Sequence, residues 1–215
     1  MLALVRRKVD CLRERSIINI GGRGNASNQL SGPYGIEFDK ITNILYIADL
    51  RNNRIMTYEK NAINGTVAFG GQDAGVNKTQ LSSPLGIYLD YLSNSLLIAN
   101  HGVHNVVRWI RSEHEWILMA GDINGVPNST STTLRQATDM VLDPMGNMYV
   151  CDRNNQRIQL FKAGEYVGQT IAGTTGVSGI NASLLNYPWS LKLDNQLNLY
   201  VLDTYNHRVQ QFLRY

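Results

Sequence analysis

Cysteine and proline are both scarce in this sequence, which has two cysteines and five prolines in 215 residues. Two cysteines, Cys11 and Cys151, do not suggest a disulfide framework. Cys151 takes a strand position that other copies of the sequence repeat described below give to alanine or leucine, so we expect a buried apolar residue rather than a nucleophile. The net charge is only +3, which by itself is too small to indicate a nucleic-acid partner.

Long apolar runs, helical periodicity and catalytic motifs are also missing. No run of 18 apolar residues predicts a membrane span, and no 3.6-residue period predicts an amphipathic helix. The sequence has no Gly-x-Ser-x-Gly, no phosphate-binding glycine loop and no nucleophile–base pair. We therefore expect a protein without membrane insertion, and its motifs favour no enzyme class.

What the chain does have is one sequence motif that is repeated four times. Each copy opens on a leucine, and these leucines are 51, 53 and 51 residues apart. Each copy also carries an aspartate at a fixed distance behind its opening, namely Asp39, Asp90, Asp143 and Asp194. Such a period predicts a repeat architecture. We expect a single domain over 1–215, with repeats starting near 30, 81, 134 and 185 and with 1–22 as the tail of a preceding or closing unit.

Each copy contains short alternating runs that are typical of strands. An Ile-x-Phe type strand is followed by a turn at Asn43, Asn94, Gly146 or Asn195-Gln196. A second strand, a four-residue polar loop, a third strand and a fourth strand ending at glycine complete the copy. Four short strands in about fifty residues predict an all-β fold, a β-propeller of four-stranded blades.

At these residues the chain resembles the NHL repeat family of β-propellers. The resemblance rests on Pro-x-Gly-Ile, on a Leu-Tyr-Ile-Ala-Asp strand and on Asp-x-x-Asn-x-Arg. Three copies match the last motif fully, through the pairs Asp49 and Arg54, Asp152 and Arg157, and Asp203 and Arg208. The second copy departs, with Asn100, Val103 and Asn105 in the three places. Because the pairs recur, we interpret them as structural, each fixing its polar loop by a charge-assisted bond.

The number of blades stays open at this point. Residues 16–20 resemble a fourth strand and could complete the last blade of a closed four-bladed ring. Residues 3–8 resemble a further third strand, for which a closed ring of four has no use. The resemblance implies a six-bladed ring as the usual number, so we favour a piece of a six-bladed ring.

The candidate binding residues are those that differ among the copies at one rim of the propeller, because variation on a rigid frame creates binding surfaces. They lie at the start of the first strand and in the loop between the second and third strands. The set is Tyr34, Arg51, His101, His104, Asp139, Arg153, Trp189 and Tyr205. His101, His104 and His114 lack the carboxylate or cysteine expected at zinc spacing, so we predict no metal and no cofactor.

We expect a non-catalytic binding or scaffold module that recognises a protein, peptide or glycan at the channel mouth. Two alternatives follow from the resemblance, an RNA-binding NHL domain associated with ubiquitin ligases and a metal-dependent lyase or hydrolase. Oligomeric state and compartment are not readable from the sequence. No signal peptide is visible, but candidate glycosylation sequons slightly favour an extracellular protein. They lie at Asn25, Asn64, Asn77, Asn128 and Asn181.

Overall fold

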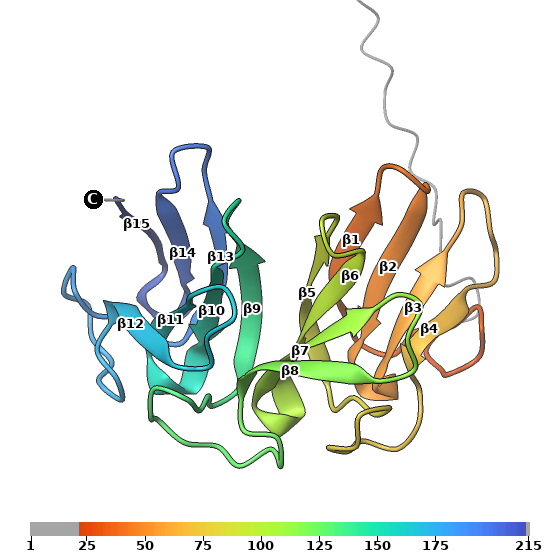
Figure 1. Cartoon of the computed structure of the whole chain (residues 1–215), viewed down its shortest axis with the longest axis horizontal. Helices are drawn as coiled ribbons and strands as arrows, with labels where there is room; N and C mark the ends of the chain where they lie inside the picture. The colour runs from red at the N-terminus through yellow and green to blue at the C-terminus, as the bar shows by residue number, and fades with distance from the viewer. Residues whose placement is uncertain (1–21, 214–215) are drawn as a thin grey trace, which may run out of the picture.

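The computed structural model describes residues 22–213 and consists of four antiparallel sheets arranged as β-propeller blades (Figure 1). The predicted all-β fold and the predicted strand order are confirmed. The resemblances noted within residues 1–21, together with Cys11, lie outside the described residues. Among the described residues, the helices are single 3-10 turns, and none could span a membrane.

Blades 1 to 3 each hold four strands in sequence order, and blade 4 holds three. Alternating apolar residues make these short strands, and each blade begins at the proline (or Ala137) of the repeat. Blade 1 is β1 (Pro33–Asp39), β2 (Ile44–Asp49), β3 (Arg54–Tyr58) and β4 (Thr66–Gly70). Blade 2 is β5 (Pro84–Asp90), β6 (Ser95–Asn100), β7 (Asn105–Ile110) and β8 (Trp116–Gly121).

Blades 3 and 4 repeat this plan with the same pairing. Blade 3 is β9 (Ala137–Leu142), β10 (Met148–Asp152), β11 (Arg157–Phe161) and β12 (Gly168–Gly173). Blade 4 is β13 (Pro188–Leu193), β14 (Leu199–Asp203) and β15 (Arg208–Phe212). Between the second and third strand of every blade lies a 3-10 turn: Leu50–Asn52, His101–Val103, Arg153–Asn155 and Thr204–Asn206.

The turn between the first two strands of blade 4 lies at Asn195-Gln196, as predicted. Its residue with a left-handed backbone is Leu197 (φ 64°), which directly follows them. The corresponding turns of blades 1 to 3 use Asn43, Asn94 and Gly146, residue types that tolerate this conformation. The backbone of the turn is set by strand pairing, so leucine adopts a strained conformation there.

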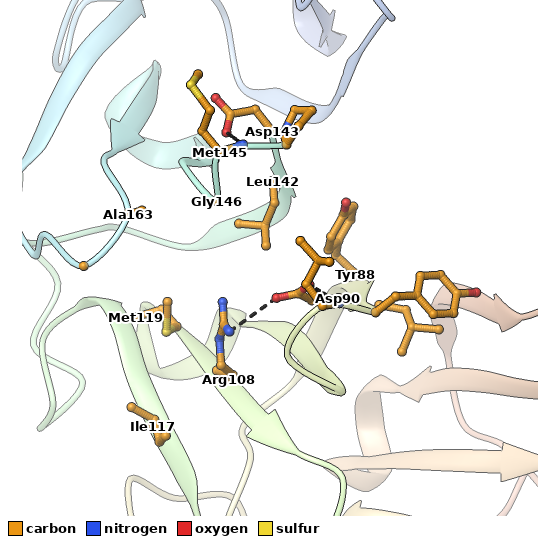
Figure 2. A pocket seen from close by; sticks show the side chains of 15 residues that line it. Tyr88, Asp90, Arg108, Ile117, Met119, Leu142, Asp143, Met145, Gly146 and Ala163 are labelled. Atoms are coloured by element: carbon orange, nitrogen blue, oxygen red, sulfur yellow. Dashed lines mark hydrogen bonds and ion pairs between the residues drawn. The ribbon is translucent and has the colours of Figure 1, made fainter. Parts of the chain in front are cut away.

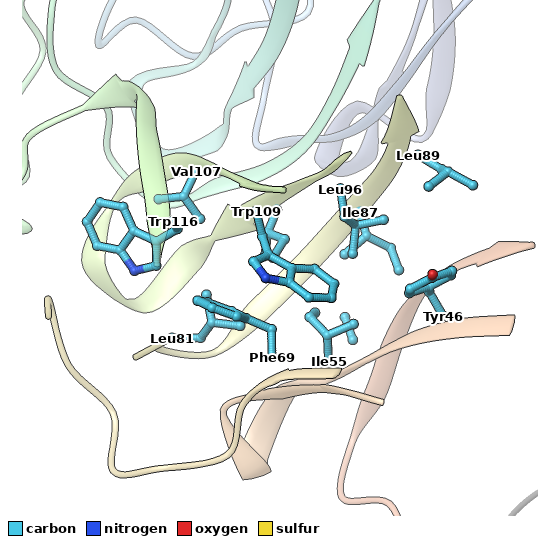
Figure 3. Packing of buried hydrophobic residues seen from close by; sticks show 12 residues of the cluster. Tyr46, Ile55, Phe69, Leu81, Ile87, Leu89, Leu96, Val107, Trp109 and Trp116 are labelled. Carbon is cyan, nitrogen blue, oxygen red and sulfur yellow. The ribbon is translucent and has the colours of Figure 1, made fainter. Parts of the chain in front are cut away.

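The core is a series of apolar layers between neighbouring blades. One layer joins blades 1 and 2, where Phe69 stacks on Trp109 at 5.4 Å between ring centroids (Figure 3). A second layer joins blades 2 and 3, and a third joins blades 3 and 4. Because each blade packs only on its neighbours, the blades are stabilised as an array.

Blades 1 and 4 have apolar side chains on the faces that lack such a layer. Ile36 of blade 1 is 65% exposed, whereas Ile87 at the same repeat position of blade 2 is 5% exposed. On the opposite side of blade 4, Leu202 is 42% exposed, although Cys151 at that position of blade 3 is fully buried. No apolar cluster of the described residues joins blade 4 to blade 1.

Polar contacts anchor the loop that enters each blade. In blade 3, Arg157 Nε donates to Asp152 at 2.8 Å, and its two other nitrogens donate to the carbonyl oxygens of Ser129, Thr130 and Thr133. Arg54 and Arg208 make the same contacts in blades 1 and 4, with their aspartates also at 2.8 Å. The three predicted Asp–Arg pairs thus join the polar turn to the entering loop.

Blade 2 anchors its loop with a different residue. There the indole Nε1 of Trp116 donates to the carbonyl oxygens of Asn77 and Gln80. Asn100 and Asn105 occupy the places of the aspartate and arginine, and each keeps a buried side-chain atom without a partner. A buried tryptophan therefore replaces the guanidinium at these carbonyls, which explains how the second copy tolerates its departure from the motif.

Candidate functional site

The first strands of the four blades lie next to one another around the central channel. β1 contacts β5, β5 contacts β9 and β9 contacts β13. All four strands line one cavity of about 220 Å³, which Tyr34 and Trp189 border at the end where the strands begin. The 3-10 turns between the second and third strands open on this end. The second-strand residue that precedes each turn pairs with the first residue of the first strand. We call this end the channel mouth.

Aromatic rings gather on the blade 4 side of the channel mouth. The rings of Tyr34 and Trp189 lie 5.7 Å apart, and those of Tyr187 and Tyr205 lie 4.9 Å apart. The Arg153 guanidinium joins the two pairs, since its central carbon lies 4.8 Å from the Tyr187 ring and 4.9 Å from the Trp189 ring. Stacked guanidinium and rings hold one another in place. The result is a preformed aromatic surface, which we call the ring cluster.

Tyr187 was not among the predicted site residues. It precedes Pro188 and has a left-handed backbone (φ 49°), as do Gly32, Ser83 and Gln136 at the same repeat position. A bulky residue rarely adopts this conformation, and such strain is concentrated at functional sites. The Tyr187 amide donates to Gln156 Oε1 at 2.6 Å, which fixes the strained backbone. The variation at this repeat position was a signal that could have identified Tyr187.

Below the ring cluster, the channel contains charged groups of both signs. Asp139 accepts hydrogen bonds from the Ser190 hydroxyl at 2.6 Å, from the Leu191 amide at 3.3 Å and from the Met140 amide at 2.9 Å. Burial raises the pKa of Asp139, although these bonds oppose the rise. Burial also raises the pKa of Glu37, with Lys192 opposing and Asp139 adding to the effect. The channel therefore offers both hydrogen-bond donors and acceptors.

The two predicted loop histidines link blades 2 and 3. Nδ1 of His104 accepts from the Gln136 amide at 3.1 Å, and Nδ1 of His101 lies 3.1 Å from the Ala137 carbonyl oxygen. Burial lowers the pKa of both rings, so the neutral forms prevail at pH 7. Among residues 22–213, no three His, Cys, Asp or Glu side chains are grouped as a metal site would require.

Of the eight predicted residues, the structure brings Tyr34, Arg153, Trp189 and Tyr205 into the ring cluster. Asp139 lies in the channel below. Arg51 is exposed on blade 1, with its side chain over Gly32. All five sequon asparagines are exposed. Cys151 is a fully buried free thiol whose pKa is raised by burial, as expected for a packing residue.

Comparison with known proteins supports the fold and leaves the activity open. The family model for the NHL repeat matches residues 134–161 and 185–212, which lie in blades 3 and 4. The protein SUPPRESSOR OF QUENCHING 1, chloroplastic, of Arabidopsis thaliana is 23% identical over 91% of this chain, and the match spans 22% of the plant protein.

Solved structures of low sequence identity share the fold. A Bacteroides thetaiotaomicron protein of unknown function has a TM-score of 0.69 at 14% identity, covering 84% of this chain and 47% of its own. An auxiliary nutrient binding protein from the same species has a TM-score of 0.65 at 19% identity, covering 82% and 46%. A gluconolactonase of Xanthomonas campestris has a TM-score of 0.66 at 15% identity, covering 89% and 61%.

The chain spans about half the length of the first two of these structures. Blades 1, 3 and 4 carry the recurring Asp–Arg pair, and blades 1 and 2 begin with Pro-x-Gly-Ile, the features on which the family resemblance rests. Together with the family match in blades 3 and 4, these features show a β-propeller that contains NHL repeats.

Proposed function

We propose that this propeller is a non-catalytic binding module whose channel mouth recognises a glycan. The observation that carries the proposal is the ring cluster, in which Tyr34 and Tyr205 are each more than half exposed. Exposed aromatic rings held by a stacked arginine are typical of recognition surfaces. Sugar rings have an apolar face that suits such rings and hydroxyl groups around their edge.

The polar groups below the cluster support the same ligand class. Glu37, Asp139 and Lys192 lie in the cavity where the hydroxyl groups of a bound sugar would reach. A few placed polar groups beside apolar walls are the usual composition of small-ligand sites. One structural neighbour is an auxiliary nutrient binding protein, which is compatible with this class of function.

The alternatives receive less support from the geometry. A polyanion such as RNA would bring its phosphates toward the carboxylates of Glu37 and Asp139, which like charge disfavours. As a general base, Asp139 is already held by hydrogen bonds to both of its oxygens. A peptide with an aromatic or proline side chain remains the closest competitor, because it would use the same rings.

Fluorescence quenching tests the proposal at Trp189, one of the predicted site residues. Trp109 and Trp116 are buried, so an aqueous quencher such as acrylamide reaches chiefly Trp189. Hits from a glycan array should protect this fluorescence on titration. Arg153→Ala should weaken the binding about tenfold or more, because it removes the stacked guanidinium. Tyr166→Ala removes an exposed ring of blade 3 outside the cluster and serves as the control.

The outcomes separate the hypotheses clearly. Protection by glycans, reduced in Arg153→Ala and unchanged in Tyr166→Ala, supports the proposal. Glycan binding that Arg153→Ala leaves intact, or protection by peptides alone, contradicts it. Bound RNA that is released as salt rises would instead support the nucleic-acid alternative.

A further inference from the structure

A large groove lies between blades 2 and 3, at the end of the strands opposite the channel mouth. It has a volume of about 710 Å³ and is lined by the turn between β5 and β6 and the turn between β9 and β10 (Figure 2). Its walls are mainly apolar, with Ile117 and Met119 on one side and Leu142 and Met145 on the other. This volume is in the range of small-molecule sites, about 300–1,000 Å³.

The equivalent space between blades 1 and 2 is filled by two side chains of blade 2. Arg111 Nη1 donates to Asp39 of blade 1 at 2.6 Å and to the Tyr46 hydroxyl at 3.2 Å. The hydroxyl of Tyr91 accepts from the Lys40 amide at 3.2 Å. The two residues thus cross from blade 2 to the end of blade 1 and close the gap.

Blade 3 has no such side chains at the same repeat positions. Arg111 lies two residues beyond Trp109, which pairs with Leu96, and Ala163 lies two residues beyond Phe161, which pairs with Met148. Tyr91 directly follows Asp90, and Pro144 directly follows Asp143. Alanine and proline in place of arginine and tyrosine leave the groove open. The groove is therefore a consequence of these two residue types in the third repeat.

The floor of the groove contains an arginine with an unpartnered donor. Arg108 rises from β7 toward Asp90, as Figure 2 shows, and its Nη1 lies 3.3 Å from the Asp90 carboxylate and donates to Ser93 Oγ at 2.8 Å. Its Nε is buried and has no partner in residues 22–213. A buried donor without an acceptor is costly, which favours an acceptor from a ligand.

We propose that this groove binds a neutral amphiphile, a small molecule with an apolar body and a carbonyl oxygen. The apolar body packs on Ile117, Met119 and Leu142, while the oxygen accepts a hydrogen bond from Arg108. Asp90 already balances the arginine charge, so an anionic ligand would meet an unfavourable second negative charge. The site is independent of the channel mouth, because it lies at the other end of the strands.

Methyl NMR with the neutral naphthyl ketone prodan tests the proposal in the whole chain. Met119 and Met145 line the groove, whereas Met56 is buried in blade 1 and provides an internal reference. With methionine methyl groups labelled, prodan should shift the resonances of Met119 and Met145 in a saturable way. The resonance of Met56 should not move.

Two variants and one control define the site. Ala163→Arg introduces the residue type that fills the equivalent space between blades 1 and 2. It should weaken prodan binding at least about tenfold. Arg108→Lys keeps a cation beside Asp90 but removes the unpartnered Nε donor, and should weaken prodan binding by about tenfold. Lys60→Arg makes an arginine at the same repeat position of blade 1, away from this groove, and should leave prodan binding unchanged.

Three results would overturn the inference. Met119 and Met145 could fail to respond to prodan at about 1 mM, the weakest affinity worth assigning to a site. Ala163→Arg, shown to be folded by unchanged resonances of the buried Met140 and Met148 of blade 3, could bind prodan as tightly as the parent. An acetylated and amidated Leu-Phe-Leu peptide could shift the two methionines where prodan does not, which would make the groove a peptide site.

Discussion

A matched pair of valines provides a direct test of how the blades are stabilised. Val106 and Val209 occupy the same repeat position, on the face that each blade turns toward its successor. Val106 is fully buried in the layer between blades 2 and 3, whereas Val209 of blade 4 is 63% exposed. We predict that the same substitution by alanine has unequal effects at the two sites.

The magnitude follows from the burial. Val106→Ala removes two buried methyl groups and leaves a cavity between two sheets, so it should lower the free energy of unfolding by about 2–3 kcal/mol. Val209→Ala removes methyl groups that already contact water, and should change it by less than about 0.5 kcal/mol. Urea unfolding measures both, followed by far-ultraviolet circular dichroism and by tryptophan fluorescence, because blades need not unfold together.

Equal losses in the two variants would refute this reasoning. Such a result would mean that something covers the outer face of blade 4 in solution. Repeating the Val209→Ala measurement over a range of protein concentrations would identify self-association as the cause, because the stability of an oligomer rises with concentration.

Three further substitutions or conditions should have measurable effects. Leu197→Gly should raise the free energy of unfolding by about 0.5–1 kcal/mol in urea, because it relieves a left-handed leucine, and a loss would contradict the strain. Burial raises the pKa of Asp39, but its hydrogen bonds, led by the one from Arg111, have the larger opposite effect. The net result is a pKa lowered from 3.8 to about 2. The stabilisation is therefore complete above pH 3.8 and is lost as pH falls toward 2, and Arg111→Ala should flatten this dependence in acid titrations. Arg157→Ala should lower the free energy of unfolding in urea by about 3–5 kcal/mol, because it leaves the buried Asp152 carboxylate without its cation. A loss below about 1 kcal/mol would exclude the anchoring role.

The repeat period made most of the fold predictable from sequence. Alternating residues located the strands, and the aspartate and arginine of the motif marked the turn between the second and third strands. Local patterns suffice here because each strand pairs with its neighbour in sequence. The left-handed backbone of Leu197 was not predicted, because leucine carries no turn signal and the strands impose its backbone conformation.

The candidate sites were less predictable, because they depend on contacts between blades. Comparing the copies pointed to Tyr34, Arg153 and Trp189, which the structure places in one cluster. It did not reveal that Trp116 takes over the arginine contacts in blade 2, since the two residues share neither type nor position in the repeat. Nor did it show the groove beside Ala163, because an absent side chain is informative only when its neighbours are known.

The bonds from each recurring arginine to the entering loop have a consequence for how such chains can change. Arg54 holds the carbonyl groups of residues 25, 26 and 29, all within its own segment of the sequence. A segment that runs from one such loop to the end of the next fourth strand contains all of its own anchoring hydrogen bonds. Such a segment could be duplicated or exchanged as a unit, and only the apolar surfaces that face its two neighbouring blades would have to become complementary again.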